Sequence, residues 1–351
     1  MNKLVDIIAE DAANILKNID LSEIRGKTIL VTGASGMLGS YFIACLRKLS
    51  DILSSPEEVP DASPPFKVTA VLHGRPDGYL AEFLSFRGSD VIYGDLTDHE
   101  FCSSLPAADF IIHAAGYGRP DRFAEDAAKT LKLGTTTLFY LFEKLHTGGK
   151  LLFISSAALY NGLSSPPFNE AQIGNTNTTH PRACYIEAKR CGEAIVNAYR
   201  AKGIKASSAR LALAYGPGVR ADDQRVLYSF IGKALQGQIT LLDKGTARRD
   251  YCYVSDAVEI MWKILLSGKE PIYNIGGNVV TVADIARITG RYLNVPVIFP
   301  AVEKGLEGAP DEVWLDMKKV REEFGEFSRV PVEVGIKRTI EWFTELNEIE
   351  R

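Results

Sequence analysis

Apolar residues in this chain fall into short continuous runs separated by longer amphipathic stretches. Runs of this length are typical of strands buried on both faces of a sheet. Strands are predicted at residues 27–31, 68–73, 91–93, 110–113, 151–155 and 206–211, with helical periodicity between most of them. Alternation of strand and helix predicts an α/β protein with a doubly wound parallel sheet.

The pattern also predicts how the chain is divided. It becomes irregular after the glycines at 216 and 218, where we expect a smaller domain to begin. The predicted parts are an amphipathic helix within residues 1–24, a sheet domain at 25–214 to which the chain returns around 253–274, and a second domain built from 215–252 and 275–351. The leading helix can pack on the sheet domain, form a dimer contact or act as a lid.

A glycine-rich turn follows the first predicted strand and opens onto a predicted helix at 37–49. Glycines in such a turn let the backbone bend sharply and approach a pyrophosphate, and the helix N-terminus offers N–H groups to the anion. The alternative is a plain strand-to-helix turn. As a dinucleotide site, the turn supplies Gly33, Ser35, Gly36, Met37, Leu38 and Gly39.

Three residues in the middle of the chain form a candidate catalytic group. Tyr185 and Lys189 are four residues apart in a predicted helix at 182–202, so they share one face. A nearby ammonium favours the phenolate and makes tyrosine a usable base. Ser156 ends a predicted strand, where sheets of this class bind ligands, and its hydroxyl can bond a substrate oxygen. The alternatives are two surface residues on a helix and a serine that caps a turn.

Composition narrows the classes of function. The chain has 351 residues, 46% of them hydrophobic and 24% charged, and its net charge of −4 favours neither nucleic acid nor membrane binding. The five cysteines show no C-x-x-C spacing and the five histidines are scattered, so we expect reduced thiols and no metal site. Acidic residues interrupt the apolar residues at 1–24, which is unlike a signal peptide, and we expect a cytoplasmic enzyme.

With these motifs in order, the sequence resembles extended short-chain dehydrogenases/reductases of the NAD-dependent epimerase/dehydratase family, which act mostly on nucleotide sugars. The resemblance covers nearly the whole chain. Beside the glycine turn and the Ser156, Tyr185, Lys189 triad, it rests on residues 95–98 (DLTD), 113–116 (HAAG), 210–218 (RLALAYGPG), 249–256 (RDYCYVSD) and 273–277 (YNIGG). It implies a Rossmann-type doubly wound parallel sheet with a smaller C-terminal substrate-binding domain.

Within that family, residues 181–185 and 220–226 are most similar to UDP-glucuronate decarboxylases. Those enzymes carry an acidic residue shortly after the hydroxyl at the strand end, whereas Ser156 is followed by Ala157 and Ala158. The second base that decarboxylation or dehydration requires is therefore missing from the expected place. A further departure is Leu213, where the family usually has an asparagine that helps hold the nucleotide diphosphate.

The resemblance implies a nucleotide-sugar epimerase. Tyr185 would deprotonate a sugar hydroxyl, expected at C4, while hydride passes to the nicotinamide. Lys189 would assist the tyrosine and hold the nicotinamide ribose, and Ser156 would orient the reacting oxygen. The alternatives are a nucleotide-sugar dehydrogenase or keto-sugar reductase, then a decarboxylase or dehydratase. From another class, the chain can be a dinucleotide-binding regulator that has lost catalysis.

The end of the second predicted strand bears on the choice of cofactor. NAD binders usually place a carboxylate there, whereas basic residues accommodate the 2′-phosphate of NADP. This strand ends in His73, followed closely by Arg75, which favours NADP and leaves NAD open. By resemblance, Asp95 contacts the adenine, and the remaining cofactor-binding residues are Leu96, Ala114, Ala115 and Gly116, together with Tyr185 and Lys189.

The nucleotide-sugar substrate is expected to meet two arginines and one loop. Arg249 is the best candidate for the diphosphate, because a guanidinium can donate two parallel hydrogen bonds to phosphate, and Arg225 can assist it. Each can instead pair with a neighbouring aspartate. Tyr117 and Arg119 follow the fourth strand and can touch the sugar. By analogy with relatives, we expect a homodimer that packs helices at 123–145 and 182–202 into a four-helix bundle.

Overall fold

A computed structural model describes residues 3–54, 63–76, 78–300 and 312–349 of the protein. Its centre is a sheet of seven strands, all paired in parallel, in the order β10-β6-β5-β4-β1-β2-β3. The strands are β1 (Thr28–Thr32), β2 (Lys67–Leu72), β3 (Ser89–Tyr93), β4 (Ala108–His113), β5 (Leu145–Ser156), β6 (Lys205–Leu211) and β10 (Ile272–Ile275). The predicted doubly wound sheet is confirmed.

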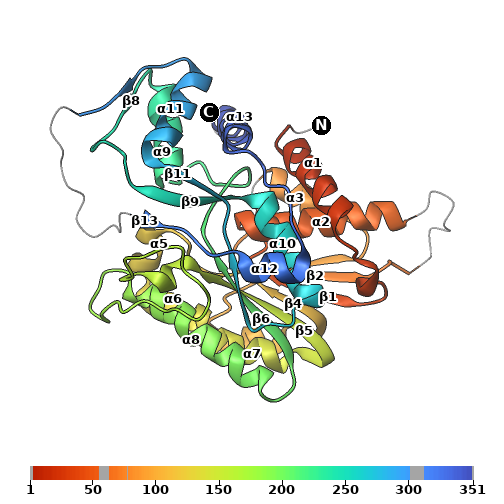
Figure 1. The fold of residues 1–351 in the computed structure, drawn as a ribbon. Coiled ribbons are helices and arrows are strands. Elements are labelled where there is room, and N and C mark those ends of the chain that lie inside the picture. The colour runs from red at the N-terminus through yellow and green to blue at the C-terminus, as the bar shows by residue number, and fades with distance from the viewer. Residues whose placement is uncertain (1–2, 55–62, 77, 301–311, 350–351) are drawn as a thin grey trace.

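Helices cover both faces of this sheet (Figure 1). On one face lie α2 (Met37–Leu53) and α10 (Val254–Ser267); on the other lie α4 (His99–Ser104), α6 (Ala127–Gly134), α7 (Thr136–Glu143) and α8 (Ala183–Arg200). The central strands are buried on both sides: Ile29 and Val31 of β1 belong to one apolar cluster, and Leu30 belongs to the other. This double burial explains the continuous apolar runs in the sequence.

The remaining chain builds a smaller part beside the sheet. Its strands are β7 (Leu213–Tyr215), β9 (Arg248–Tyr253), β11 (Asn278–Thr281) and β13 (Glu312–Val313) in a second sheet, with β8 (Ile239–Thr240) paired to β12 (Val297–Ile298). Its helices are α9 (Val226–Leu235), α11 (Val282–Leu293), α12 (Lys318–Phe324) and α13 (Val332–Ile349). Between the two parts, α10 and β10 bring the chain back to the large sheet.

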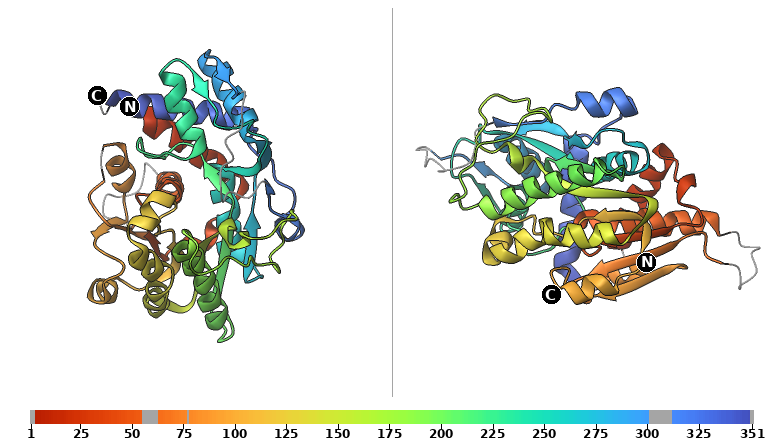
Figure 2. Two further views of the ribbon diagram at one scale, coloured as in Figure 1. Left: turned by 90° about the vertical axis from the view of Figure 1, so that its left-hand side faces the viewer. Right: turned by 90° about the horizontal axis from the view of Figure 1, so that it is seen from below.

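The two ends of the described chain lie together. Helix α1 (Lys3–Asn18), followed by the short helix η1 (Ser22–Ile24), packs on α2, α10 and α13, and both views in Figure 2 show α1 close to α13. The buried carboxylate of Asp11 accepts hydrogen bonds from the hydroxyls of Tyr41 (2.8 Å) and Tyr253 (2.9 Å) and pairs with Arg338 at 3.1 Å. The leading helix is thus joined to both parts of the molecule.

One predicted helix is wrong in its extent. Residues 123–145 form the end of α5 (Pro120–Glu125), then α6 and α7, and Leu145 already belongs to β5. The breaks have local causes: the Asp126 carboxylate accepts a hydrogen bond from the backbone N–H of Lys129 and caps α6, and Thr135 separates α6 from α7. Among the described residues, no helix has the length and apolarity to cross a membrane.

Candidate active site

The glycine turn between β1 and α2 is built by close backbone contacts. Gly33 has φ +68°, and a Cβ there would lie 2.6 Å from the backbone nitrogen of Ala115. A Cβ on Gly39 would lie 2.2 Å from the carbonyl oxygen of Gly33, so both positions exclude any larger residue. Gly36 begins α2 with no side-chain cap, while Ser35 and Gly36 are exposed. The first N–H groups of α2 therefore have no side-chain cap, which fits a pyrophosphate.

A buried histidine holds the strand ends next to this turn. In His113, Nδ1 lies 2.8 Å from the hydroxyl oxygen of Thr32, and Nε2 lies 2.8 Å from the carbonyl oxygen of Leu133 in α6. Burial lowers the pKa of His113 to about 4, so the ring is neutral at neutral pH. His113 precedes Ala114, Ala115 and Gly116, and its two contacts fix this predicted cofactor segment against β1 and α6.

The other predicted cofactor residues lie at the carboxyl ends of β2 and β3. His73 and Arg75 are exposed just beyond β2. Asp95 lies beyond β3, pairs with Lys129 of α6 at 2.7 Å, and accepts hydrogen bonds from the backbone N–H and the hydroxyl of Thr97. Burial raises the pKa of Asp95, but these hydrogen bonds outweigh it and lower the pKa to about 2. Leu96 is buried, and its carbonyl oxygen accepts a hydrogen bond from Thr137.

The triad residues meet where β5 ends beside α8. The ammonium of Lys189 is buried and donates a 2.7 Å hydrogen bond to the carbonyl oxygen of Ile154, two residues before Ser156. Its Nζ lies 5.8 Å from the ring centroid of Tyr185, and a Cβ on Gly116 would lie 3.6 Å from it. The Ser156 hydroxyl accepts a hydrogen bond from the Ala158 N–H, so the predicted capping role is also present.

Burial and charge act in opposite directions on Tyr185. Burial raises the pKa of this tyrosine; the Ser156 hydroxyl, by hydrogen bonding, and the guanidinium of Arg225, by its charge, lower it. Burial also lowers the pKa of Lys189 to about 8, against the effect of the Glu193 carboxylate. Burial outweighs the two opposing groups, so that the pKa of Tyr185 is raised overall. The expected effect of Lys189 on Tyr185 stays a prediction.

A buried network of polar side chains, which we call the α8 network, lies next to the triad and connects α8 with β5 and β6. Glu193 of α8 accepts a hydrogen bond from Ser155 at 2.6 Å and forms a two-pronged ion pair with Arg210 of β6. Arg210 also donates to the Tyr160 hydroxyl in η2 (Ala157–Tyr160) at 2.9 Å. The sequence analysis does not single out Glu193. Its position four residues after Lys189 places both side chains on one face of the helix, and this spacing is visible in the sequence.

The predicted substrate residues lie in different environments. Arg119 pairs with Asp121 and Asp222, and Arg225 pairs with Asp223, the alternative that the sequence left open for Arg225. Tyr117 is half-buried near Lys129, on the side of Asp95. Arg249, on β9, donates to the carbonyl oxygen of Arg248; the neighbouring Asp250 accepts N–H bonds from Gly277 and Leu315. Leu213, at the start of β7, is 43% exposed.

Comparison with known proteins agrees with this geometry. Residues 29–276 match the model of the NAD dependent epimerase/dehydratase family, which covers most of the chain. The chain belongs to this family. Its curated relatives are enzymes. One of them, UDP-glucuronic acid decarboxylase 6 of Arabidopsis thaliana, is 30% identical over 88% of this chain and 86% of the relative. The resemblance stated from the sequence is thereby confirmed.

Solved structures of family members have the same fold. The UDP-glucose 4-epimerase of Thermotoga maritima, solved with UDP-glucose, is 23% identical, covers 91% of this chain and 99% of its own, and has a TM-score of 0.73. The dTDP-glucose 4,6-dehydratase of Streptomyces venezuelae, solved with NAD, is 21% identical, covers 92% and 98%, and has a TM-score of 0.75. Relatives thus include decarboxylases, epimerases and dehydratases.

Proposed function

We propose that the protein is an NAD(P)-dependent nucleotide-sugar epimerase that transiently oxidises a sugar hydroxyl, with C4 as the expected position. The observation that carries this proposal is the environment of Tyr185. Burial raises the pKa of Tyr185, while Ser156, by a hydrogen bond, and Arg225, by its charge, act in the other direction and favour the phenolate. Ala157 and Ala158 occupy η2, where a decarboxylase or dehydratase of this family would carry an acid. This environment supports reversible proton transfer without a second carboxylate base.

The chemistry of the chain follows from three side chains. The phenolate of Tyr185 takes the proton of the sugar hydroxyl, and the same phenol returns it to the carbonyl oxygen when the keto-sugar is reduced on its other face. Ser156 would bond the reacting oxygen. Lys189, whose ammonium donates to the carbonyl oxygen of Ile154 in β5, would assist the tyrosine and hold the ribose of the nicotinamide. When bound, a nicotinamide dinucleotide would accept the hydride and give it back.

The residues at the strand ends fit such a dinucleotide. Gly33, Gly36 and the start of α2 would hold the pyrophosphate, and Gly116 would lie beside Lys189. The exposed His73 and Arg75 support NADP, while the structure of a relative contains NAD. We infer that Arg249 binds the diphosphate of the sugar nucleotide. The exposed side chains of Leu131 on α6 and Phe139 on α7 support the expected homodimer through the α6–α7 and α8 face.

The test is a product analysis on a panel of UDP-, dTDP-, GDP- and CDP-sugars by mass spectrometry, together with the cofactor released from the purified protein. We expect a product of unchanged mass and altered retention time. Tyr185→Phe should lower kcat by about 10²–10⁴-fold, because it removes the general base, and should leave cofactor binding intact. A lighter product, by carbon dioxide or water, would contradict the epimerase. A product that differs from the substrate by two hydrogens would instead favour a dehydrogenase or reductase. Unchanged biological activity of the Tyr185→Phe variant would favour the dinucleotide-binding regulator that has lost catalysis.

A further inference from the structure

Helix α5 contacts Tyr185 through an aromatic side chain. The rings of Phe123 and Tyr185 have centroids 4.9 Å apart, and their planes differ by only 13°, so the two rings are stacked. Phe123 is 4% exposed, whereas Tyr185 is half-buried. Phe123 therefore covers one face of the phenol ring and leaves the tyrosine partly open to a ligand, while its own ring has almost no accessible surface.

The stacking restrains both torsions of the tyrosine side chain. A change of χ1 would move the whole phenol, and the ring of Phe123 blocks the phenol on one face. The torsion χ2 is broad for tyrosine, so the plane of the ring depends on its neighbours. The hydroxyl oxygen lies on the axis of χ2 and accepts best near the ring plane, so this plane sets the direction from which it takes a proton. A parallel ring fixes that plane.

The backbone of Phe123 is also fixed relative to α8. Its carbonyl oxygen accepts hydrogen bonds from the hydroxyl of Thr130 in α6 at 3.2 Å and from the thiol of Cys184 in α8 at 3.4 Å. Cys184 directly precedes Tyr185. Phe123 therefore contacts two consecutive residues of α8, the first through its backbone and the second through its ring.

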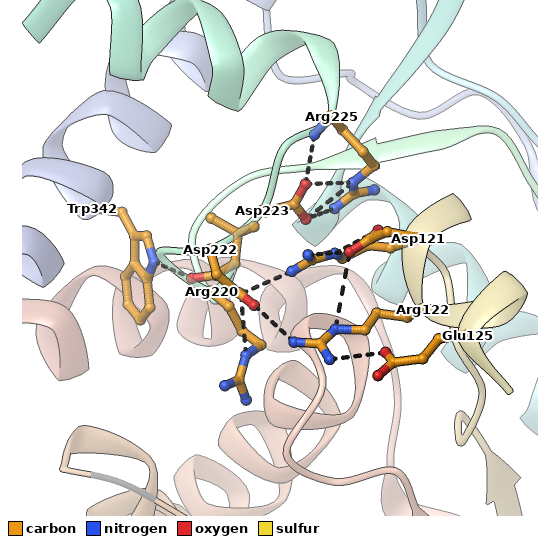
Figure 3. A network of polar contacts seen from close by, with 10 residues as sticks. Asp121, Arg122, Glu125, Arg220, Asp222, Asp223, Arg225 and Trp342 are labelled. Atoms are coloured by element: carbon orange, nitrogen blue, oxygen red, sulfur yellow. Dashed lines mark hydrogen bonds and ion pairs between the residues drawn. The ribbon is translucent and has the colours of Figure 1, made fainter. Parts of the chain in front are cut away.

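Ion pairs connect α5 with residues 219–225, about a hundred residues later in the chain. Asp222 accepts hydrogen bonds from Arg119 Nη1, just before α5, at 2.8 Å and from Arg122 Nη2, within α5, at 3.1 Å. Figure 3 shows Asp222 between Arg220 and Arg122. The short helix that carries Phe123 is thus held by contacts with α6, with α8 and with residues 219–225.

We propose that Phe123 is a positioning residue for Tyr185: its stacked ring keeps the phenol in the orientation that takes the proton of the substrate hydroxyl. The inference rests on the proposed function, because it gives Tyr185 the part of the base. The ring of Phe123 has almost no surface for a substrate, so its effect passes through the tyrosine. Loss of the ring should therefore lower kcat and leave KM nearly unchanged.

The first measurement requires no substrate. Near-ultraviolet circular dichroism detects aromatic side chains that are held in one packed environment. The spectrum of the wild type minus that of Tyr185→Phe gives the signal of Tyr185, and the same difference in the Phe123→Leu background should lose most of its intensity. Phe142→Leu is the matched control, because it removes a ring that stacks on Tyr199 near the end of the same helix, with centroids 3.8 Å apart and planes at 6°. In that background the Tyr185 signal should be kept.

Kinetics on the substrate found by the product analysis then measure the consequence for the reaction. Phe123→Leu should lower kcat by about tenfold, because the base is less well oriented, while KM changes by less than about threefold. Phe123→Tyr keeps a flat ring and should recover most of kcat, and Phe142→Leu should keep kcat in full. If Phe123→Leu does not fold, Phe123→Met, another apolar side chain without a ring, replaces it in both measurements.

Three results would overturn the proposal. The first is an unchanged Tyr185 signal and an unchanged kcat in Phe123→Leu. The second is a large rise in KM with kcat retained, because the ring would then act on substrate binding. The third is loss of the Tyr185 signal in Phe142→Leu as well, because any loosening of α8 would then release the tyrosine. A failed product analysis, with the Tyr185 signal lost in Phe123→Leu alone, would overturn the proposed function and leave the restraint of Tyr185 by Phe123 in place.

Discussion

Two networks of charged side chains differ in their exposure to water. One is the α8 network, on the helix that carries Tyr185; the other, here called the 219–225 network, consists of the ion pairs of Asp222 with Arg119 and Arg122, beside the helix whose Phe123 stacks on Tyr185. In the α8 network, the side chains of Arg210 and Glu193 are 3% and 5% exposed. In the 219–225 network, those of Arg122 and Asp222 are 46% and 44% exposed. A buried pair must keep both partners, because a single buried charge is costly, whereas an exposed pair contributes little to stability.

The two networks are expected to differ in their effect on the stability of the fold. The α8 network joins β5, α8 and β6 next to the triad, so that its loss should destabilise the fold together with the site. The 219–225 network bridges two parts of the molecule through groups that water also solvates. Its loss should leave the fold intact. The stability of the fold should therefore depend on the α8 network more than on the 219–225 network.

The largest expected effect breaks the buried side. Glu193→Ala leaves the guanidinium of Arg210 buried without its carboxylate, and we expect the free energy of unfolding to fall by about 3–5 kcal/mol. Urea denaturation followed by circular dichroism measures it. The matched control is Glu187→Ala on the same helix, which loses only a half-exposed pair with Arg190 and should cost less than about 1 kcal/mol. Equal losses in the two variants would remove the distinction between the networks.

This comparison also explains what the sequence predicts well. The glycine turn, the strand runs and the Tyr185–Lys189 spacing are local patterns, because period and turn chemistry act over a few residues. The ion pairs of Asp222 with Arg119 and Arg122 join positions about a hundred residues apart, and only the fold brings them together. The same holds for the stacking of Phe123 on Tyr185. The chain has many arginines and aspartates, and its sequence does not indicate which of them pair across a long separation.

The break between α5 and α6 has a local signal that the prediction did not use. Residues 123–145 have enough apolar residues at helical spacing to predict one helix. Asp126 nevertheless has the side chain of an N-cap, and its bond to the backbone of Lys129 begins a new helix there. The break matters for the site, because it makes α5 a separate short element that carries Phe123 and Arg122 together.

The second prediction tests the buried support of the cofactor segment through pH. The folded protein keeps His113 neutral down to about pH 4, whereas in the unfolded chain the ring takes up a proton near pH 6.5. Since the unfolded state binds more protons in this window, the contribution of His113 is fully present above pH 6.5 and is lost as the pH falls toward 4. The loss amounts to about 3 kcal/mol.

The measurement compares the wild type with His113→Gln in urea denaturation at several pH values between 4 and 7. We expect the difference between their free energies of unfolding to shrink by about 3 kcal/mol toward the acid end, because the variant has no ring to titrate. His99→Gln, at an exposed position, is the matched loss of an imidazole. A difference that stays constant with pH would mean that water reaches His113 and that its contacts with Thr32 and Leu133 open readily.

The smallest expected effect belongs to the exposed side. Asp222→Asn removes one carboxylate that three arginines share at the surface, and we expect the free energy of unfolding to change by less than about 1 kcal/mol. Nearby Asp121, Glu125 and water remain to solvate Arg119 and Arg122. If the free energy of unfolding in urea falls as much as in Glu193→Ala, the ion pairs of Asp222 stabilise the fold as strongly as the buried network does. The contrast between the two networks is then contradicted. A small loss would mean that the ion pairs of Asp222 contribute almost nothing to the stability of the fold, as their exposure to water predicts.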